Sequence, residues 1–263
     1  MRVTLFLNRD LYCNVVLNQL LPGLASHHVS VFYSENVGRA PDLEALDLLR
    51  LIEKDIPYDH VFRIADSPGE LLTERHLERA LGVSFEPMRD PNHPDSLERI
   101  RRLKPEVVVS IRYGRIFKRD FISIPRLGVL NLHSGILPDY RGVMATFRAM
   151  AAGADEIGCT LHFIDDPSVD TGPVISEWRR PIDQRQSYFG HVLSLYPPGA
   201  GLVVDGLAQL EAGKTLETRP QQRNAGMYFS YPEAPDIEEF EKKGFRLFHP
   251  AEYRELLGRY HSA

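Results

Sequence analysis

Val-Val-Val at residues 107–109 is the most strand-like tripeptide of the chain, and Gly-Val-Leu-Asn-Leu-His at residues 128–133 predicts another strand after a Pro/Gly turn. Apolar side chains follow one another in both stretches, which is typical of strands that are covered on both faces of a sheet. We therefore expect these two strands to lie at the centre of a sheet.

The sequence on either side alternates strand-like and helical patterns. The amino-terminal side predicts strands at residues 3–7 and 29–32 and helices at residues 15–24, 42–53, 71–81 and 97–103, the second of these ended by Pro57. The carboxy-terminal side predicts a helix at residues 144–152, extended segments at 158–164 and 173–178, and a helix that starts near residues 197–199. Strands that alternate with helices are the signature of βαβ units. The predicted fold class is therefore α/β, with a Rossmann-like, open, mostly parallel sheet and helices on both faces.

The composition of the chain changes after residue 213. The last 50 residues are rich in Arg, Glu, Tyr and Phe. So short a segment cannot bury its aromatic side chains in a core of its own, so they must pack on the main domain, close one side of a substrate site or contact a second chain as in a homodimer. We predict a main domain at residues 1–212 and a small carboxy-terminal extension at residues 213–263.

The overall composition excludes several classes of protein. The 263 residues carry 31 basic and 36 acidic side chains, a formal net charge of -5 that does not favour a nucleic-acid partner. Since no apolar run of about 18 residues exists, we expect no membrane span, and a cytoplasmic location fits best. The two cysteines, Cys13 and Cys159, lie far apart without a Cys/His cluster, so we expect neither a disulfide framework nor a metal site.

The densest polar cluster follows the strand at residues 128–133. Asn131 and His133 are two residues apart on that strand and share a face, and Asp170 follows 37 residues after the histidine. An amide beside an imidazole suits a reaction in which a carbonyl oxygen gains negative charge, and a carboxylate would orient the histidine. On the residues alone, a structural histidine and a turn aspartate remain equally open.

The stretches at residues 131–142, 158–164 and 170–175 together resemble the folate-dependent formyltransferases, which include glycinamide ribonucleotide transformylase, methionyl-tRNA formyltransferase and the sugar N-formyltransferases. The resemblance covers about residues 1–212, which would form the catalytic domain, and implies 10-formyltetrahydrofolate as co-substrate without a metal ion. It implies that Asn131 and His133 stabilise and protonate the formyl oxygen of a tetrahedral intermediate, while Asp170 tunes His133 and relays a proton. The attacking group would be the amine of a substrate.

The same resemblance places the folate between two loops. Arg115, Ile116 and Phe117 would contact it from one side, and Val169 from the other. The alternative is that Ile116 and Phe117 only belong to the core. His162 matches a strand residue of the family, and we expect it to pack and form hydrogen bonds without a catalytic role.

Departures from the family pattern limit the choice of acceptor. No glycine-rich phosphate loop follows the first strand, so a ribonucleotide phosphate is disfavoured. The extension is about half as long as the carboxy-terminal domain of the methionyl-tRNA enzymes, which disfavours tRNA. We therefore expect a small-molecule amine, either an N-hydroxyornithine-type amino acid or a nucleotide-linked amino sugar, held by Asp10, Tyr12 and Asn14.

Other functions remain open. They are glycinamide ribonucleotide transformylase, a formyltetrahydrofolate hydrolase in which water replaces the amine, and a folate- or nucleotide-binding module without catalysis. A nicotinamide-dependent enzyme is disfavoured because no Gly-x-Gly-x-x-Gly motif follows the first strand.

Overall fold

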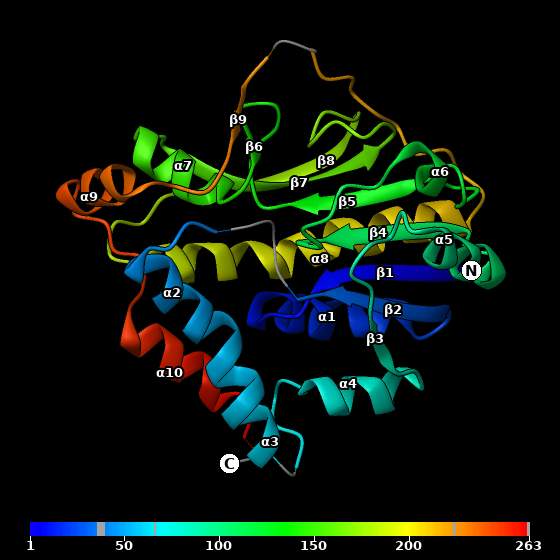
Figure 1. Cartoon of the computed structure of the whole chain (residues 1–263), viewed down its shortest axis with the longest axis horizontal. Helices are drawn as coiled ribbons and strands as arrows, with labels where there is room; N and C mark the ends of the chain where they lie inside the picture. Colours follow the sequence, from blue (N-terminus) through cyan, green and yellow to red (C-terminus); the bar gives the residue numbers. More distant parts are fainter. Residues whose placement is uncertain (36–39, 66, 223–224, 262–263) are drawn as a thin grey trace.

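The computed structural model describes residues 1–35, 40–65, 67–222 and 225–261, so residues 36–39 and 66 of the predicted main domain and residues 223–224 and 262–263 of the predicted extension lie outside the described residues. A sheet of seven strands in the order β3-β2-β1-β4-β5-β7-β8 forms the centre of the molecule (Figure 1). The first five are parallel, and the last two are antiparallel to their neighbours. The strands are β1 (Arg2–Asn8), β2 (His28–Ser34), β3 (Phe85–Pro87), β4 (Val107–Ile111), β5 (Val129–His133), β7 (Glu156–Ile164) and β8 (Val174–Pro181). The predicted fold class is confirmed.

Helices cover both faces of this sheet. Val107 and Val109 point into a large core with α1 (Leu11–Leu24) and α8 (Tyr188–Glu211), whereas Val108 points into a second core with α5 (Pro94–Leu103) and α6 (Arg119–Ile122). This alternation is the period of two that a strand imposes on its side chains. The remaining helices are α2 (Glu44–Arg50), η1 (Leu51–Asp55), η2 (Pro57–Val61), α3 (Phe62–Ile64), α4 (Glu74–Leu81), α7 (Ala145–Ala152), α9 (Ala234–Lys242) and α10 (Pro250–Gly258).

Several predicted helix boundaries are wrong, among them the starts predicted at residues 71 and 97, since α4 begins at Glu74 and α5 at Pro94. Helix α1 starts at Leu11 rather than residue 15 because the Asp10 side chain accepts a hydrogen bond from the backbone N–H of Cys13 and caps the helix. The helix predicted to end before Pro57 continues as two π-helical turns, with Pro57 in the first turn of η2, where its missing N–H costs little. Helix α8 starts at Tyr188, capped by Ser187, and continues through Pro197 and Pro198.

Packing explains why the two prolines do not end α8. Leu195 on one side of them and Val203 on the other are both buried in the large core. The burial of this long helix against the sheet offsets the hydrogen bonds that the prolines remove.

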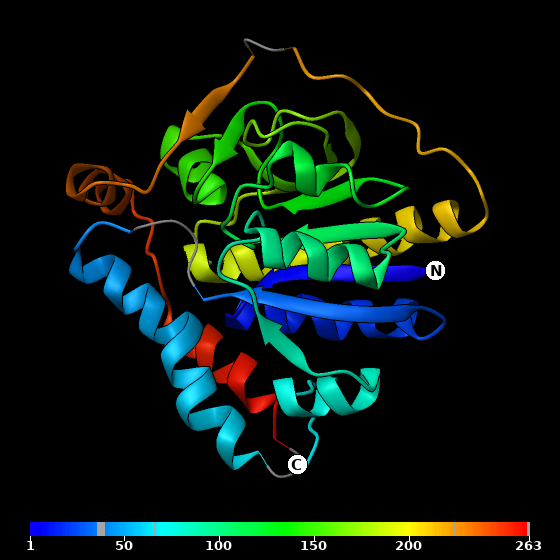
Figure 2. The ribbon, with the colours of Figure 1, turned by 45° about the vertical axis from the view of Figure 1, so that its right-hand side comes forward.

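The carboxy-terminal extension packs on the rest of the chain. Its strand β9 (Met227–Phe229) pairs in parallel with β6 (Tyr140–Gly142). In Figures 1 and 2, α10 lies beside the helical segment that follows α2. There Tyr253 donates a hydrogen bond to the carbonyl of Ile52, and the fully buried Tyr260 donates one to Asn14. The extension therefore shares the large core, and the boundary between the main domain and the extension at residue 213 stays a prediction.

None of the helices within the described ranges is long and apolar enough to cross a membrane.

The order of the strands determines where a ligand can bind. After β1 the chain builds β2 and β3 on one side and then crosses to β4 on the other. In an open α/β sheet, ligands bind outside the carboxyl ends of the strands at such a switch point.

Candidate active site

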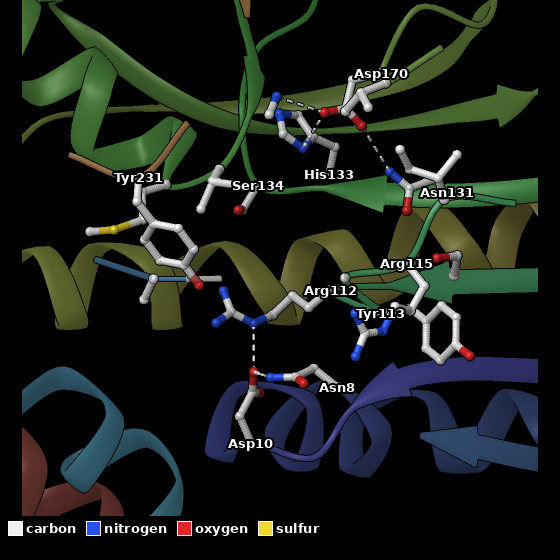
Figure 3. A pocket seen from close by; sticks show the side chains of 18 of the residues that line it. Asn8, Asp10, Arg112, Tyr113, Arg115, Asn131, His133, Ser134, Asp170 and Tyr231 are labelled. Carbon is white, nitrogen blue, oxygen red and sulfur yellow. Dashed lines mark hydrogen bonds and ion pairs between the residues drawn. The ribbon is translucent and has the colours of Figure 1, made fainter. Parts of the chain in front are cut away.

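A cavity of about 630 Å³ lies at the carboxyl ends of β1, β4 and β5, next to the switch point. Its walls come from these strand ends, the helix α2 with η1, the loop before Asp170 and the carboxy-terminal extension. Figure 3 shows the polar side chains that converge on it. A cavity in this position, with several polar side chains that converge on it, is the default candidate for an active site.

The structure brings Asn131, His133 and Asp170 together on one wall of the cavity. Nδ1 of His133 lies 3.5 Å from Oδ2 of Asp170, and the amide nitrogen of Asn131 lies 3.4 Å from Oδ1 of the same carboxylate. Nε2 of His133 is bonded to the carbonyl oxygen of Tyr140 at 2.7 Å. The carboxylate thus connects an amide and an imidazole (Figure 3).

The surroundings of Asp170 keep it ionised. Burial alone would raise its pKa, but the charge of His133, the His162 ring and the backbone N–H of Gly142 together lower it to about 2. Asp170 also adopts the left-handed backbone conformation, with φ of 55°. Such conformations are rare for residues with a side chain and gather at functional sites. Four described non-glycine residues have positive φ, and Arg112, Met144 and Asp170 among them line this cavity.

His162 lies behind the wall of the cavity that carries Asn131, His133 and Asp170, which is called the catalytic wall below. Its side chain is 1% exposed, and Nδ1 lies 2.8 Å from the carbonyl oxygen of Phe163. Nε2 lies 3.0 Å from the amide nitrogen of Asn131. His162 therefore orients Asn131 without contact with the cavity.

The four residues predicted to contact folate all line the cavity. Ile116 is 55% exposed, a large fraction for an isoleucine, whereas Phe117 is buried and stacked between Tyr113 and Phe121. The alternative that Ile116 is a core residue is wrong. Phe117 belongs to the second core and supports the loop from behind.

Only one of the three residues predicted to hold the acceptor lies at the cavity. Asp10 lines it, but Tyr12 is fully buried near Phe189 and Tyr196, and Asn14 is buried against Asn18 and Tyr260. The placement of Tyr12 and Asn14 at the acceptor site is wrong. The physical reason is that α1 already begins at Leu11, so residues 12 and 14 turn into the core.

Sequence reasoning missed a second polar group at the cavity. Arg112 follows the last residue of β4, and its Nε lies 2.8 Å from Oδ2 of Asp10 while a terminal nitrogen lies 3.4 Å from Oε2 of Glu53. Tyr188 and Tyr231 line the cavity close by. A signal for Arg112 existed, because a charged residue directly after a central strand falls at the functional edge of the sheet.

No metal centre accompanies these groups in the described ranges. Within residues 1–35, 40–65, 67–222 and 225–261, no three His, Cys, Asp or Glu side chains are arranged to hold a metal ion. The polar groups that line the cavity are hydrogen-bond donors, carboxylates and the imidazole of His133.

Comparisons with known proteins agree with the geometry. The family model described as formyl transferase matches residues 47–189. The chain is 28% identical over 194 residues to the methionyl-tRNA formyltransferase of Kosmotoga olearia, a match that covers 72% of this chain and 62% of that protein. The chain thus spans less than two thirds of the length of this curated relative.

Solved structures share the fold. A sugar N-formyltransferase from a Shewanella species has a TM-score of 0.56 and 16% identity, over 99% of this chain and 88% of that chain. An N-formyltransferase from Helicobacter canadensis, solved in complex with folinic acid and dTDP-3-aminofucose, has a TM-score of 0.59 and 19% identity, over 90% of this chain and 72% of that chain.

Proposed function

Since this chain belongs to the formyl transferase family, we propose that it transfers a formyl group from 10-formyltetrahydrofolate to the amine of a small molecule. The observation that carries the proposal is the convergence of Asn131, His133 and Asp170 on one wall of a cavity at the switch point of the sheet. This arrangement supports a formyl transfer in which negative charge develops on an oxygen next to fixed donors.

The reaction joins the acceptor nitrogen to the formyl carbon and breaks the bond from that carbon to the folate nitrogen. The acceptor nitrogen loses a proton, and the folate nitrogen gains one. Asn131 donates its amide to the formyl oxygen, and the contact that this oxygen would replace is the longer one, at 3.4 Å to Asp170. The ionised Asp170 stabilises the protonated form of His133 through charge.

His133 supplies a proton to the formyl oxygen of the tetrahedral intermediate and takes it back when that intermediate breaks down. Nε2 of His133 is hydrogen-bonded to the carbonyl oxygen of Tyr140. Proton delivery from this nitrogen therefore requires the ring to move away from that carbonyl. His162 acts as a positioning residue because its ring nitrogen holds the Asn131 amide.

The residues of two loops, the one after β4 and the one before Asp170, fit a folate. Ile116 and Val169 give an apolar surface for a flat ring system, and Arg115 is an exposed cation suited to the carboxylates of a folate. Phe117 supports Ile116 through its stack with Tyr113 and Phe121. The folinic acid bound in the Helicobacter canadensis complex supports the same class of formyl donor here.

Two acceptor classes are proposed, an N-hydroxyornithine-type amino acid and a nucleotide-linked amino sugar. Both offer an amine that is nucleophilic only when neutral. Asp10 is the remaining sequence-predicted residue at this end of the cavity.

The test combines binding and turnover. Calorimetry with 5-formyltetrahydrofolate should show binding, and His133→Ala should keep that affinity while formyl transfer from 10-formyltetrahydrofolate falls about 100-fold to 10,000-fold. His60→Ala, which removes an exposed histidine from η2, is the matched control and should leave both unchanged. Absence of folate binding, or a His133→Ala enzyme with normal turnover and normal circular dichroism, would contradict the proposed function.

A further inference from the structure

The cavity has a second end, where three charged side chains meet away from the catalytic wall. Asp10, Arg112 and Glu53 all line the cavity, although their side chains are only 2%, 18% and 15% exposed. Figure 3 shows Arg112 and Asp10 opposite the wall that carries Asp170, with Tyr231 above them. Ionised groups this far from water need counterions or ligands.

The charges in this group do not balance. Asp10 takes the short bond from Nε of Arg112, at 2.8 Å, and also accepts from Asn8 and from the backbone N–H of Cys13. Glu53 has the longer contact with Arg112, at 3.4 Å, and its other neighbour is the uncharged hydroxyl group of Tyr12. One guanidinium therefore faces two carboxylates, and the charge of Glu53 is the one that lacks a full partner.

Protonation of Glu53 removes this excess of negative charge as long as no second cation is bound beside it. Burial is the main cause that raises the pKa of Glu53 to about 7; the charge of Asp10 adds to it, while the charge of Arg112 and a hydrogen bond with Tyr12 oppose it. A carboxylate with such a pKa is ready to ionise when a positive group approaches. The π-helical turn η1 places Glu53 here, and such turns occur frequently at functional sites.

The side chains that line the whole cavity also carry an excess of negative charge. Among the described residues that line it, six are acidic and four are Lys or Arg. The acidic ones are Asp10, Glu35, Asp47, Glu53, Asp166 and Asp170. Arg112 is the cation of the group formed with Asp10 and Glu53, and it is already held by these two carboxylates. It is therefore not free to bind a phosphate group.

We propose that Glu53 binds a second, protonated amino group of the acceptor, so that the acceptor is a diamine or a diamino acid rather than a phosphorylated or nucleotide-linked amine. This inference rests on the proposed function, in which the other amino group is formylated at His133. The rings of Tyr188 and Tyr231 at the same end add favourable faces for an ammonium group.

Binding without folate tests the proposal separately from turnover. Diamines from 1,3-diaminopropane to 1,6-diaminohexane and ornithine are titrated into the full chain at pH 8, each alkyl diamine beside the monoamine of equal length, with glucosamine 6-phosphate as the anionic amine. We expect at least one dicationic amine to bind roughly tenfold more tightly than its monoamine and than glucosamine 6-phosphate. Equal affinities in the unaltered protein would overturn the inference.

Substitution locates the site. Glu53→Gln keeps the shape and should remove the preference for the diamine, while its affinity for 5-formyltetrahydrofolate stays within about twofold. Glu44→Gln makes the same charge change on an exposed position of α2 outside the cavity and should have no effect. A Glu53→Gln protein that still prefers the diamine would also overturn the inference.

The pH dependence gives a third readout. Arg112, Asp10, Tyr12, Tyr188 and Tyr231 are the titratable groups near Glu53, and the tyrosines stay neutral between pH 6 and 8 because burial raises the pKa of each. Diamine binding should therefore tighten as pH rises through about 7, where Glu53 ionises, and this rise should be absent in Glu53→Gln. Failure of folate binding in the unaltered protein would contradict the proposed function, whereas a missing diamine preference contradicts this inference alone.

Discussion

Replacing Asp170 by Asn removes the charge at the centre of the catalytic wall with almost no change in shape. Asn tolerates the left-handed backbone that this position requires, so the substitution should not strain the loop. The backbone N–H of Gly142 keeps an oxygen acceptor in the asparagine side chain. What is lost is the negative charge beside His133 and His162.

The pKa of Asp170 gives the magnitude. The pKa falls from 3.8 to about 2 on folding, which corresponds to about 2 kcal/mol of stability at pH 7. Because the folded state lowers the pKa, this stability is present in full above pH 3.8 and disappears as pH falls through 2. About half of the difference between the parent and Asp170→Asn should remain at pH 3.

Urea denaturation followed by circular dichroism measures the difference at pH 7, 5 and 3. Asp205→Asn, on the exposed side of α8, is the matched control and should stay within about 0.5 kcal/mol of the parent. Formyl transfer by Asp170→Asn should fall about as far as in His133→Ala, since the imidazolium loses its counterion. Equal stabilities of parent and Asp170→Asn at pH 7, or a difference that stays constant down to pH 3, would refute the electrostatic argument.

Four further substitutions test the roles of single residues. Ile116→Ala should weaken 5-formyltetrahydrofolate binding about tenfold in calorimetry while the unfolding free energy stays constant, whereas Phe117→Ala should cost about 3 to 5 kcal/mol of stability in urea because it opens the second core. Gly226→Ala should lower the unfolding free energy by at least about 1 kcal/mol, because φ of Gly226 is 71° and the added methyl group would meet the carbonyl of Pro138. It should also raise the KM for the acceptor. An unchanged KM would show that β9 does not contribute to the acceptor site. Tyr260→Phe should cost about 1 kcal/mol through the lost bond to Asn14, as measured in urea, and an unaltered denaturation midpoint would show that this bond contributes nothing.

The sheet and the shared strand of Asn131 and His133 could be predicted because their signals are local. A buried strand shows as a run of apolar residues, and its end fixes where Asn131 and His133 lie. The same strand logic fails one step later at Asp10, Tyr12 and Asn14. Side chains two residues apart share a face only in a strand, and this segment is helical from Leu11 onward, where each residue turns by about 100°.

The placement of Glu53 and Tyr231 at the opposite end of the cavity could not be predicted because no local pattern describes it. Glu53 reaches Arg112 from a π-helical turn, and nothing in the alternation of apolar residues distinguishes that turn from an ordinary helix. Tyr231 arrives from the far end of the chain, after the extension has paired β9 with β6. Both placements depend on tertiary packing.

The catalytic wall and the opposite end of the cavity can be altered independently of each other. The catalytic wall is built on β5 and on the loop that carries Asp170, so its groups are fixed by strand pairing and by a hydrogen-bonded carboxylate. At the opposite end, Asp10 and Arg112 follow β1 and β4, whereas Glu53 on η1 and Tyr231 in the extension lie outside the sheet. Substitutions there can alter the charge that an acceptor meets without moving Asn131 or His133. Glu53→Gln and Asp170→Asn should therefore act independently: the first should change KM for the acceptor, the second kcat, and their effects on the free energy of transition-state binding should add within about 0.5 kcal/mol.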